Sequence, residues 1–107
     1  MVRLIFTTFS NSDDAASVVR QLVEERLAAC GTILPGARSI YVWNGQMEDT
    51  EEAVVIFKTT AETFPVFETR LKELHPYETP EVVAFDPAKV SPDYAAWIAA
   101  QVGQQLA

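Results

Sequence analysis

The only histidine of the chain lies in segment 74–81, which reads LHPYETPE. Pro76 disfavours a helical backbone at His75 and cannot itself donate a backbone hydrogen bond, so a helix that enters this segment ends before the histidine. The two prolines constrain the connection that follows and present Tyr77 and Glu78 beside the imidazole. The segment therefore predicts either a small ligand site or a rigid connector between a helix and a strand.

His75 is the leading candidate for a metal ligand, because a neutral imidazole suits copper, zinc or nickel. No H-x-x-x-H or C-x-x-C pattern accompanies it, and single histidines also serve as surface or packing residues. Cys30 is a further candidate as a soft ligand. Its expected place at the C-terminus of a helix disfavours a thiolate, and the alternative is a small buried apolar residue. The residues alone therefore leave two interpretations of His75 open, a ligand of a divalent metal and a surface or packing residue.

Two groups of carboxylates offer weaker signals. The run from Glu48 to Glu52 lacks the glycine and the spacing of a calcium loop, and alternate strand side chains point to opposite faces, so it reads as a solvated arm. Glu78 and Glu81, with Tyr77, are the only conceivable acid and base groups. No P-loop, dinucleotide fingerprint, nucleophile elbow or H-E-x-x-H motif is present. We therefore expect a protein that is not an enzyme.

Aromatic side chains suggest a binding cleft. Trp43 and Tyr77, with Lys58 as a cationic companion, are candidates to line a pocket between subunits for a small anionic or aromatic ligand. Tyr94, Trp97 and Arg38 belong to the same group. The alternative is that the aromatic residues form the apolar core of an interface.

Composition sets the class of protein. With 107 residues, 49% of them hydrophobic, the chain is expected to form one domain over residues 1–107. A net charge of −7 with eight basic residues disfavours nucleic acid as a partner. No stretch approaches the roughly 20 apolar residues of a membrane span, and residues 1–4 lead into a strand instead of a secretory signal. The single cysteine agrees with a reducing compartment and equally suits a mature exported chain. We expect a cytoplasmic protein without a membrane partner.

The elements that position these residues follow from periodicity and turn signals. Strands are predicted at 2–9, 32–43, 46–59 and 81–85. The first helix is predicted from its cap Ser12 to near Cys30, with Gly31 available for the left-handed stop. Further helices are predicted from Glu62 or Thr63 to Leu74 and from Ser91 to about Leu106. Asn44-Gly45 predicts a type I′ hairpin turn, and Pro35-Gly36 predicts a bulge. The order βαββαβ with a trailing helix predicts an α+β, ferredoxin-like sandwich, in which two helices cover one face of a four-stranded antiparallel sheet.

The hairpin between 32 and 59 is unusually long. Its arms are about twice the usual strand length of ~5–6 residues, so the tip should project beyond the body of the domain. The tip carries the apolar run Ile40 to Trp43. A lone two-stranded ribbon is marginal in water, so we infer that the tip packs on another copy of the protein.

Nearly the whole chain resembles one known family, the CutA divalent-cation tolerance proteins. The resemblance is carried by EERLAAC at 24–30, ILPG at 33–36, SIY at 39–41, Trp43, Gly45, KT at 58–59, ELHPYETPE at 73–81, Asp93-Tyr94 and Trp97. It implies a ferredoxin-like homotrimer in which the long hairpins extend the sheets between subunits, as in the PII signalling proteins. It also implies tolerance of copper and other divalent cations, with a copper site. We expect no organic cofactor.

The resemblance assigns roles position by position. His75 matches the family's histidine before Pro-Tyr, and Cys30 matches a cysteine at the end of the first helix. The resemblance thus implies a divalent metal at His75, with Glu78 or Cys30 as additional ligands. Some members have a second histidine just before this histidine, where this chain has Leu74. Some also have a cysteine in the first strand, where this chain has Thr7. An alternative function is a PII-like trimeric sensor or assembly module, whose intersubunit clefts bind a small metabolite or a partner protein.

Overall fold

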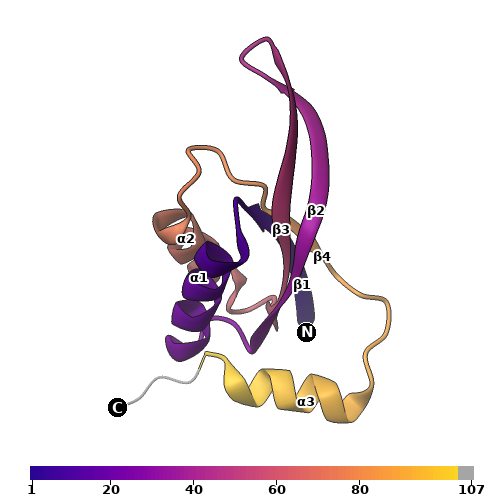
Figure 1. The fold of residues 1–107 in the computed structure, drawn as a ribbon. Helices are drawn as coiled ribbons and strands as arrows, with labels where there is room; N and C mark the ends of the chain where they lie inside the picture. The colour runs from indigo at the N-terminus through magenta and orange to yellow at the C-terminus, as the bar shows by residue number, and fades with distance from the viewer. Residues whose placement is uncertain (104–107) are drawn as a thin grey trace.

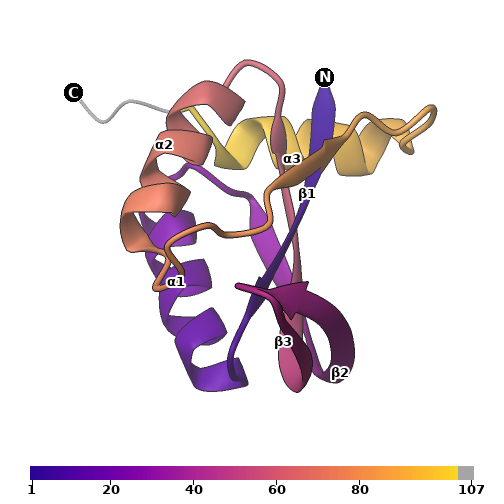
Figure 2. The ribbon, with the colours of Figure 1, turned by 90° about the horizontal axis from the view of Figure 1, so that it is seen from above.

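The computed structural model describes residues 1–103 of the chain and confirms the predicted order of elements (Figure 1). The strands and helices are β1 (Val2–Phe9), α1 (Ser12–Glu24), β2 (Cys30–Trp43), β3 (Gln46–Thr60), α2 (Phe64–Leu74), β4 (Val83–Phe85) and α3 (Pro92–Gln101). The strands form one antiparallel sheet in the order β2-β3-β1-β4. Helices α1 and α2 lie side by side on one face (Figure 2). This is a ferredoxin-like α+β fold.

The two faces of the sheet have different surroundings. Strand alternation directs Ile5, Phe9, Val55 and Phe57 toward α1 and α2, where they form a fully buried core with the helix residues Leu22, Phe67 and Leu71. Thr7 faces the same core. Its side chain is fully buried, and its hydroxyl has no hydrogen-bond partner among residues 1–103. The helix-facing side of the sheet is therefore largely apolar. Thr59 is also buried on this side, but its hydroxyl donates to the Leu27 carbonyl at 2.7 Å, whereas the hydroxyl of Thr7 has no such partner.

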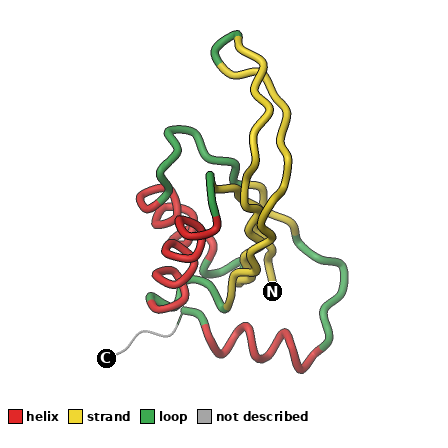
Figure 3. The backbone as a smooth tube through the Cα atoms, viewed as in Figure 1, coloured by secondary structure: helices red, strands yellow, loops and turns green. Residues whose placement is uncertain are grey.

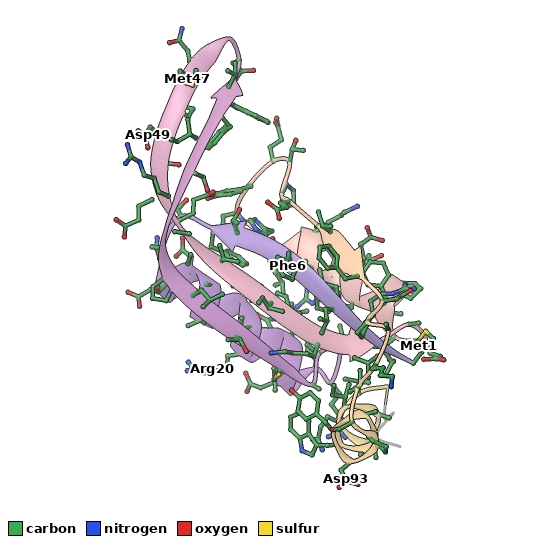
Figure 4. The ribbon with its side chains drawn as sticks, turned by 90° about the vertical axis from the view of Figure 1, so that its right-hand side faces the viewer. Met1, Phe6, Arg20, Met47, Asp49 and Asp93 are labelled. Atoms are coloured by element: carbon green, nitrogen blue, oxygen red, sulfur yellow. The ribbon has the colours of Figure 1, made fainter. Side chains whose placement is uncertain are left out.

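The other face of the sheet is open over much of its area. Helix α3 covers the end from which β1 starts, where Ile98 and Val102 pack on Val2. Beyond α3, Phe6 lies on this face (Figure 4) and stacks on Phe85, with ring centroids 4.9 Å apart. Val83 and Phe85 are 43% and 46% exposed. The open face thus presents apolar side chains to solvent.

The β2–β3 arm rises beyond the body, as predicted (Figure 3). Positive φ angles of 51° at Asn44 and 77° at Gly45 fit the predicted turn. The register shifts between Leu34 and Ala37, which confirms the bulge at Pro35-Gly36. Figure 4 shows Met47 and Asp49 near the far end of the arm. The arm carries one face of the candidate site described below.

Several predicted boundaries were wrong. Helix α1 ends at Glu24 instead of near Cys30, and Arg26, with φ of 61°, takes the left-handed conformation that was expected at Gly31. The reason is tertiary: Ala28 is buried in the core and the Ala29 N–H donates to the Lys58 carbonyl, so the chain already pairs with β3. Cys30 consequently begins β2 and is not at a helix terminus.

The remaining differences are smaller. Asn11, not Ser12, caps α1, because its side chain accepts the Asp14 N–H at 2.8 Å. Strand β4 begins at Val83 instead of residue 81, and α3 ends at Gln101 because Val102 is extended. The predicted helical position Leu106 lies outside the described residues. Within residues 1–103, no helix has the length and apolarity that a membrane span requires.

Candidate functional site

A cavity of about 510 Å³ lies between the base of the arm and segment 77–81. Its lining contains three aromatic rings, three carboxylates and no basic residue: Thr8, Tyr41, Trp43, Glu52, Tyr77, Glu78, Thr79 and Glu81. This volume lies within the usual range of small-molecule sites. The cavity is the principal candidate site of the described residues.

Strand alternation explains why the arm contributes these side chains. Tyr41 and Trp43 are two residues apart and share a face of β2. Glu52 lies on the same face of the ribbon, because it pairs with Ala37 and residues that pair across strands point the same way. Thr8 pairs with Val54, two residues from Glu52, so it also shares this face. The cavity is therefore continuous with the open face of the sheet.

His75 anchors the other wall of the cavity. Helix α2 ends before His75, as predicted. The residue is 6% exposed, and its ring stacks on Phe9 with centroids 4.2 Å apart. Nδ1 accepts the Tyr77 backbone N–H at 3.1 Å. That bond fixes the neutral tautomer in which Nε2–H donates to the Thr8 carbonyl at 2.8 Å. Both ring nitrogens are therefore occupied by backbone hydrogen bonds.

This environment favours the neutral imidazole. Burial lowers the pKa of His75, while the Thr8 carbonyl and the charge of Glu52 partly oppose the shift. Protonation would place a hydrogen on Nδ1 directly against the Tyr77 N–H. His75 thus holds the start of segment 75–81 against the end of β1.

A short chain of hydroxyl groups reaches the carboxylate of Glu52. The Ser10 hydroxyl donates to the Tyr77 oxygen at 3.2 Å, and the Tyr77 hydroxyl donates to Glu52 Oε2 at 2.7 Å. Burial raises the pKa of the Tyr77 hydroxyl; the bond from Ser10 opposes this shift, and the charge of Glu52 adds to it. Tyr77 consequently remains a proton donor to Glu52 at neutral pH.

Glu52 is the most unusual group in the cavity. It is only 8% exposed, and no Lys, Arg or His nitrogen of the described chain lies within ion-pair distance of it. Its one hydrogen bond among residues 1–103 comes from the neutral Tyr77 hydroxyl. A buried carboxylate without a cationic partner is energetically costly, so a positive charge supplied from outside the chain would stabilise this site.

Known proteins are similar to this chain over nearly its whole length. The sequence model of the CutA1 divalent ion tolerance proteins matches residues 3–101. The chain belongs to the CutA1 family. It is 39% identical over 103 residues to the divalent-cation tolerance protein CutA of Thermus thermophilus, covering 96% of this chain and 100% of that protein. The predicted family is therefore confirmed.

Solved CutA structures confirm the fold. CutA from Xylella fastidiosa superposes with a TM-score of 0.91 at 44% identity, covering 94% of this chain and 97% of that one. A CutA from Archaeoglobus fulgidus, described as a periplasmic divalent cation tolerance protein, gives 0.87 at 31% identity, covering 92% and 95%. The CutA1 family is named for tolerance of divalent ions and not for a reaction.

The structure brings together only some of the residues predicted as a site in this CutA1 protein. Trp43, Tyr77 and Glu78 line the cavity, and His75 lies next to it. Lys58 lies elsewhere: it pairs with Leu4 of β1, four residues and about 13 Å from Thr8 along the strand. Its Nζ donates to the Thr32 hydroxyl.

Cys30 also lies away from the cavity, because it pairs with Lys58. Its Sγ is 3.9 Å from the Tyr94 hydroxyl, and the Tyr94 ring stacks on Trp97 with centroids 5.8 Å apart. The aromatic residues predicted for one pocket are thus divided between two ends of the sheet. Within residues 1–103, no three His, Cys, Asp or Glu side chains converge as a metal-binding group.

Sequence reasoning missed Glu52 and Tyr41. Glu52 was placed in a solvated acidic arm, but segment 77–81 covers it. The one available signal was its position immediately before the apolar run that starts at Ala53, where β3 enters the body of the domain.

Proposed function

We propose that this CutA1 protein is a homotrimer that binds divalent metal ions, copper among them, and acts in tolerance of these ions by binding and not by catalysis, in the cytoplasm. The family name supports the divalent cation as the ligand. The observation that carries the proposal is Glu52, a buried carboxylate that lines a cavity and has no cationic partner in the described chain. A bound cation would supply the missing positive charge.

The proposed ligands are oxygen atoms. Glu52 and Glu78 line the cavity with Glu81, and carboxylates suit hard divalent ions, whereas copper prefers imidazole. His75 becomes a ligand only when Nδ1 releases the Tyr77 N–H or Nε2 releases Thr8. Cys30 is too far along the sheet to join them and would serve a separate site.

The number of metal-ligating side chains favours a metal site whose ligands do not all come from one chain. Because no group of three metal-ligating side chains converges within residues 1–103, the remaining ligands would be water or side chains of a second subunit. The net charge of −7 would raise the local concentration of cations around the protein.

Two surfaces support the trimer. The open sheet face exposes Phe85 and Val83 beside Phe6, and the arm exposes Ile40, Val42 and Trp43 by 61%, 61% and 47%. Apolar surface of this kind marks an interaction site in soluble proteins. Strands β2 and β4 are the edges of the sheet and leave backbone groups free to pair with another chain.

Metal binding is tested by titrating Cu(II) and Mn(II) against a competing chelator. The variants are Glu52→Gln, which removes the buried charge, and Glu51→Gln, a matched control that removes the neighbouring exposed charge on the opposite face of β3. We expect Glu52→Gln to weaken binding and Glu51→Gln to leave it near the wild-type value. Equal affinity in both variants and the wild type would reduce metal binding to a surface effect.

The trimer is tested by Trp43→Asp. Truncating a buried large aromatic side chain costs roughly 3–5 kcal/mol, so a charge at an interface position should dissociate the trimer at micromolar concentration. Light scattering after gel filtration measures the mass. An unchanged mass and melting temperature would show that Trp43 lies outside the interface.

A second candidate function is a PII-like sensor whose cavity binds a small metabolite. The observation that favours it is the aromatic wall of Tyr41, Trp43 and Tyr77. These rings would contribute little to the binding of a bare metal ion. A thermal-shift screen of metabolites tests it, and the absence of any stabilising compound would count against it.

A further inference from the structure

We propose that the cavity binds an aliphatic diammonium ion, a short carbon chain with an ammonium group at each end. The proposal deepens the second candidate function and rests on it in one respect, that the cavity takes a small molecule. It does not require that the protein bind metal.

The charges of the cavity exclude anions and favour cations. Its lining contains Glu52, Glu78 and Glu81 and no Lys, Arg or His. Glu52 is the decisive group, because it is 8% exposed and its one hydrogen bond within residues 1–103 comes from a neutral hydroxyl. An ammonium group at this point would give Glu52 both a counter-charge and hydrogen-bond donors.

The rings of the cavity indicate an organic cation and not a bare ion. Tyr41 and Trp43 are 41% and 47% exposed and form the arm side of the cavity, opposite Tyr77. Aromatic faces attract ammonium groups and also remove methylene groups from water. A metal ion with its hydration shell uses neither property, whereas an alkyl ammonium ion uses both.

The arrangement of the carboxylates indicates two ammonium groups. Glu52 is buried, while Glu78 and Glu81 are exposed on the segment that forms the opposite wall. A diammonium ion can place one end against the buried carboxylate and the other against the exposed pair, with its carbon chain along the rings. The volume of about 510 Å³ has room for such a molecule.

The test is calorimetric titration of the full chain, freed of metal with a chelator, with 1,5-diaminopentane. Two compounds of the same length are matched controls: 1-aminopentane has one charge and 1,5-pentanediol has none. We expect the diamine to bind most tightly, the monoamine more weakly, and the diol not at all. Equal binding of diol and diamine, or no heat from the diamine at millimolar concentration, would overturn the proposal.

Variants locate the site. Glu52→Gln should weaken binding about tenfold or more, because the ligand loses a charged hydrogen-bond partner. Tyr41→Leu keeps an apolar side chain but removes the ring, so it should weaken binding several-fold, by about the amount of one cation–π contact. Glu51→Gln is the matched control and should change affinity by less than a factor of about two, since an exposed charge contributes little. Equal weakening by Glu51→Gln and Glu52→Gln would overturn the cavity assignment.

The same samples separate this proposal from the proposed metal function. Metal binding without diamine binding would overturn the diammonium ligand and leave the metal function standing. Diamine binding without metal binding would overturn the metal function and support the diammonium ligand.

Discussion

Replacing His75 by alanine should destabilise the fold whether or not metal is present, because the ring joins distant parts of the chain. It stacks on Phe9 and hydrogen-bonds the backbone of Thr8 at the end of β1 and of Tyr77 in the cavity wall. Alanine removes all three interactions at once. The cavity wall formed by residues 77–81 should lose its anchor to the sheet.

The size of the effect follows from these contacts. Truncating a buried aromatic side chain to alanine costs about 3–5 kcal/mol, and His75 is a buried residue, 6% exposed. The lost hydrogen bonds contribute about 0.5–1.5 kcal/mol each. Because water can replace part of them once the ring is gone, we expect a total loss of about 3–5 kcal/mol.

His75→Asn is the matched variant. An asparagine side-chain oxygen accepts the N–H of the residue two positions on, so it can replace the bond from Nδ1 to Tyr77 but not the bond to Thr8 or the stacking. We therefore expect His75→Asn to recover about 1 kcal/mol relative to His75→Ala.

Urea unfolding at fixed protein concentration, followed by circular dichroism in the presence of chelator, measures both variants. A loss below about 1 kcal/mol for His75→Ala would refute the anchoring role, because such a value is typical of an exposed substitution. So would equal stability of the alanine and asparagine variants.

Three further predictions follow from the same structure. Stability should be fully present above pH ~6.5 and fall as the pH drops below it, because burial lowers the folded-state pKa of His75 and protonation then favours the unfolded chain; urea midpoints from pH 7.5 to 5 measure this, and a step that persists in His75→Asn would contradict it. Thr7→Val should stabilise the protein by about 1 kcal/mol, because it removes a buried hydroxyl without a partner; a lower thermal midpoint would show that the hydroxyl is satisfied. Gly31→Ala should cost about 1–3 kcal/mol, since its Cβ would lie 2.8 Å from Val19 Cγ1; Val19→Ala in the same chain should restore part of the loss, and no rescue would place the strain elsewhere.

The features predicted well from the sequence are those set by local chemistry. Asn44-Gly45 specifies a turn with positive φ at both residues, and Pro76 ends α2 whatever surrounds it. The end of α1 is different. Gly31 looks like a helix stop, but it serves close packing of Val19 against β2, and the left-handed residue is Arg26. Long-range pairing of Ala29 with β3 decides this boundary, and no local signal reports it.

The same distinction applies to the site. Segment 74–81 stands out because prolines, a histidine and a carboxylate occur together, and its residues do line a cavity. The burial of His75 depends on Phe9 and Thr8, which are more than sixty positions away in the chain. Lys58 shares a sheet face with Trp43 but lies far from it along the strand. The spacing of residue types in the sequence does not reveal how far apart two residues lie along paired strands.

The most direct test of the proposed function is native mass spectrometry of the metal-free protein after addition of Cu(II) or Mn(II), because one spectrum reports both subunit number and bound metal. We predict a trimer that takes up metal in the wild type and in Glu51→Gln, and a trimer that takes up little or none in Glu52→Gln. A monomeric wild type, or equal metal uptake by the wild type and Glu52→Gln, would contradict it.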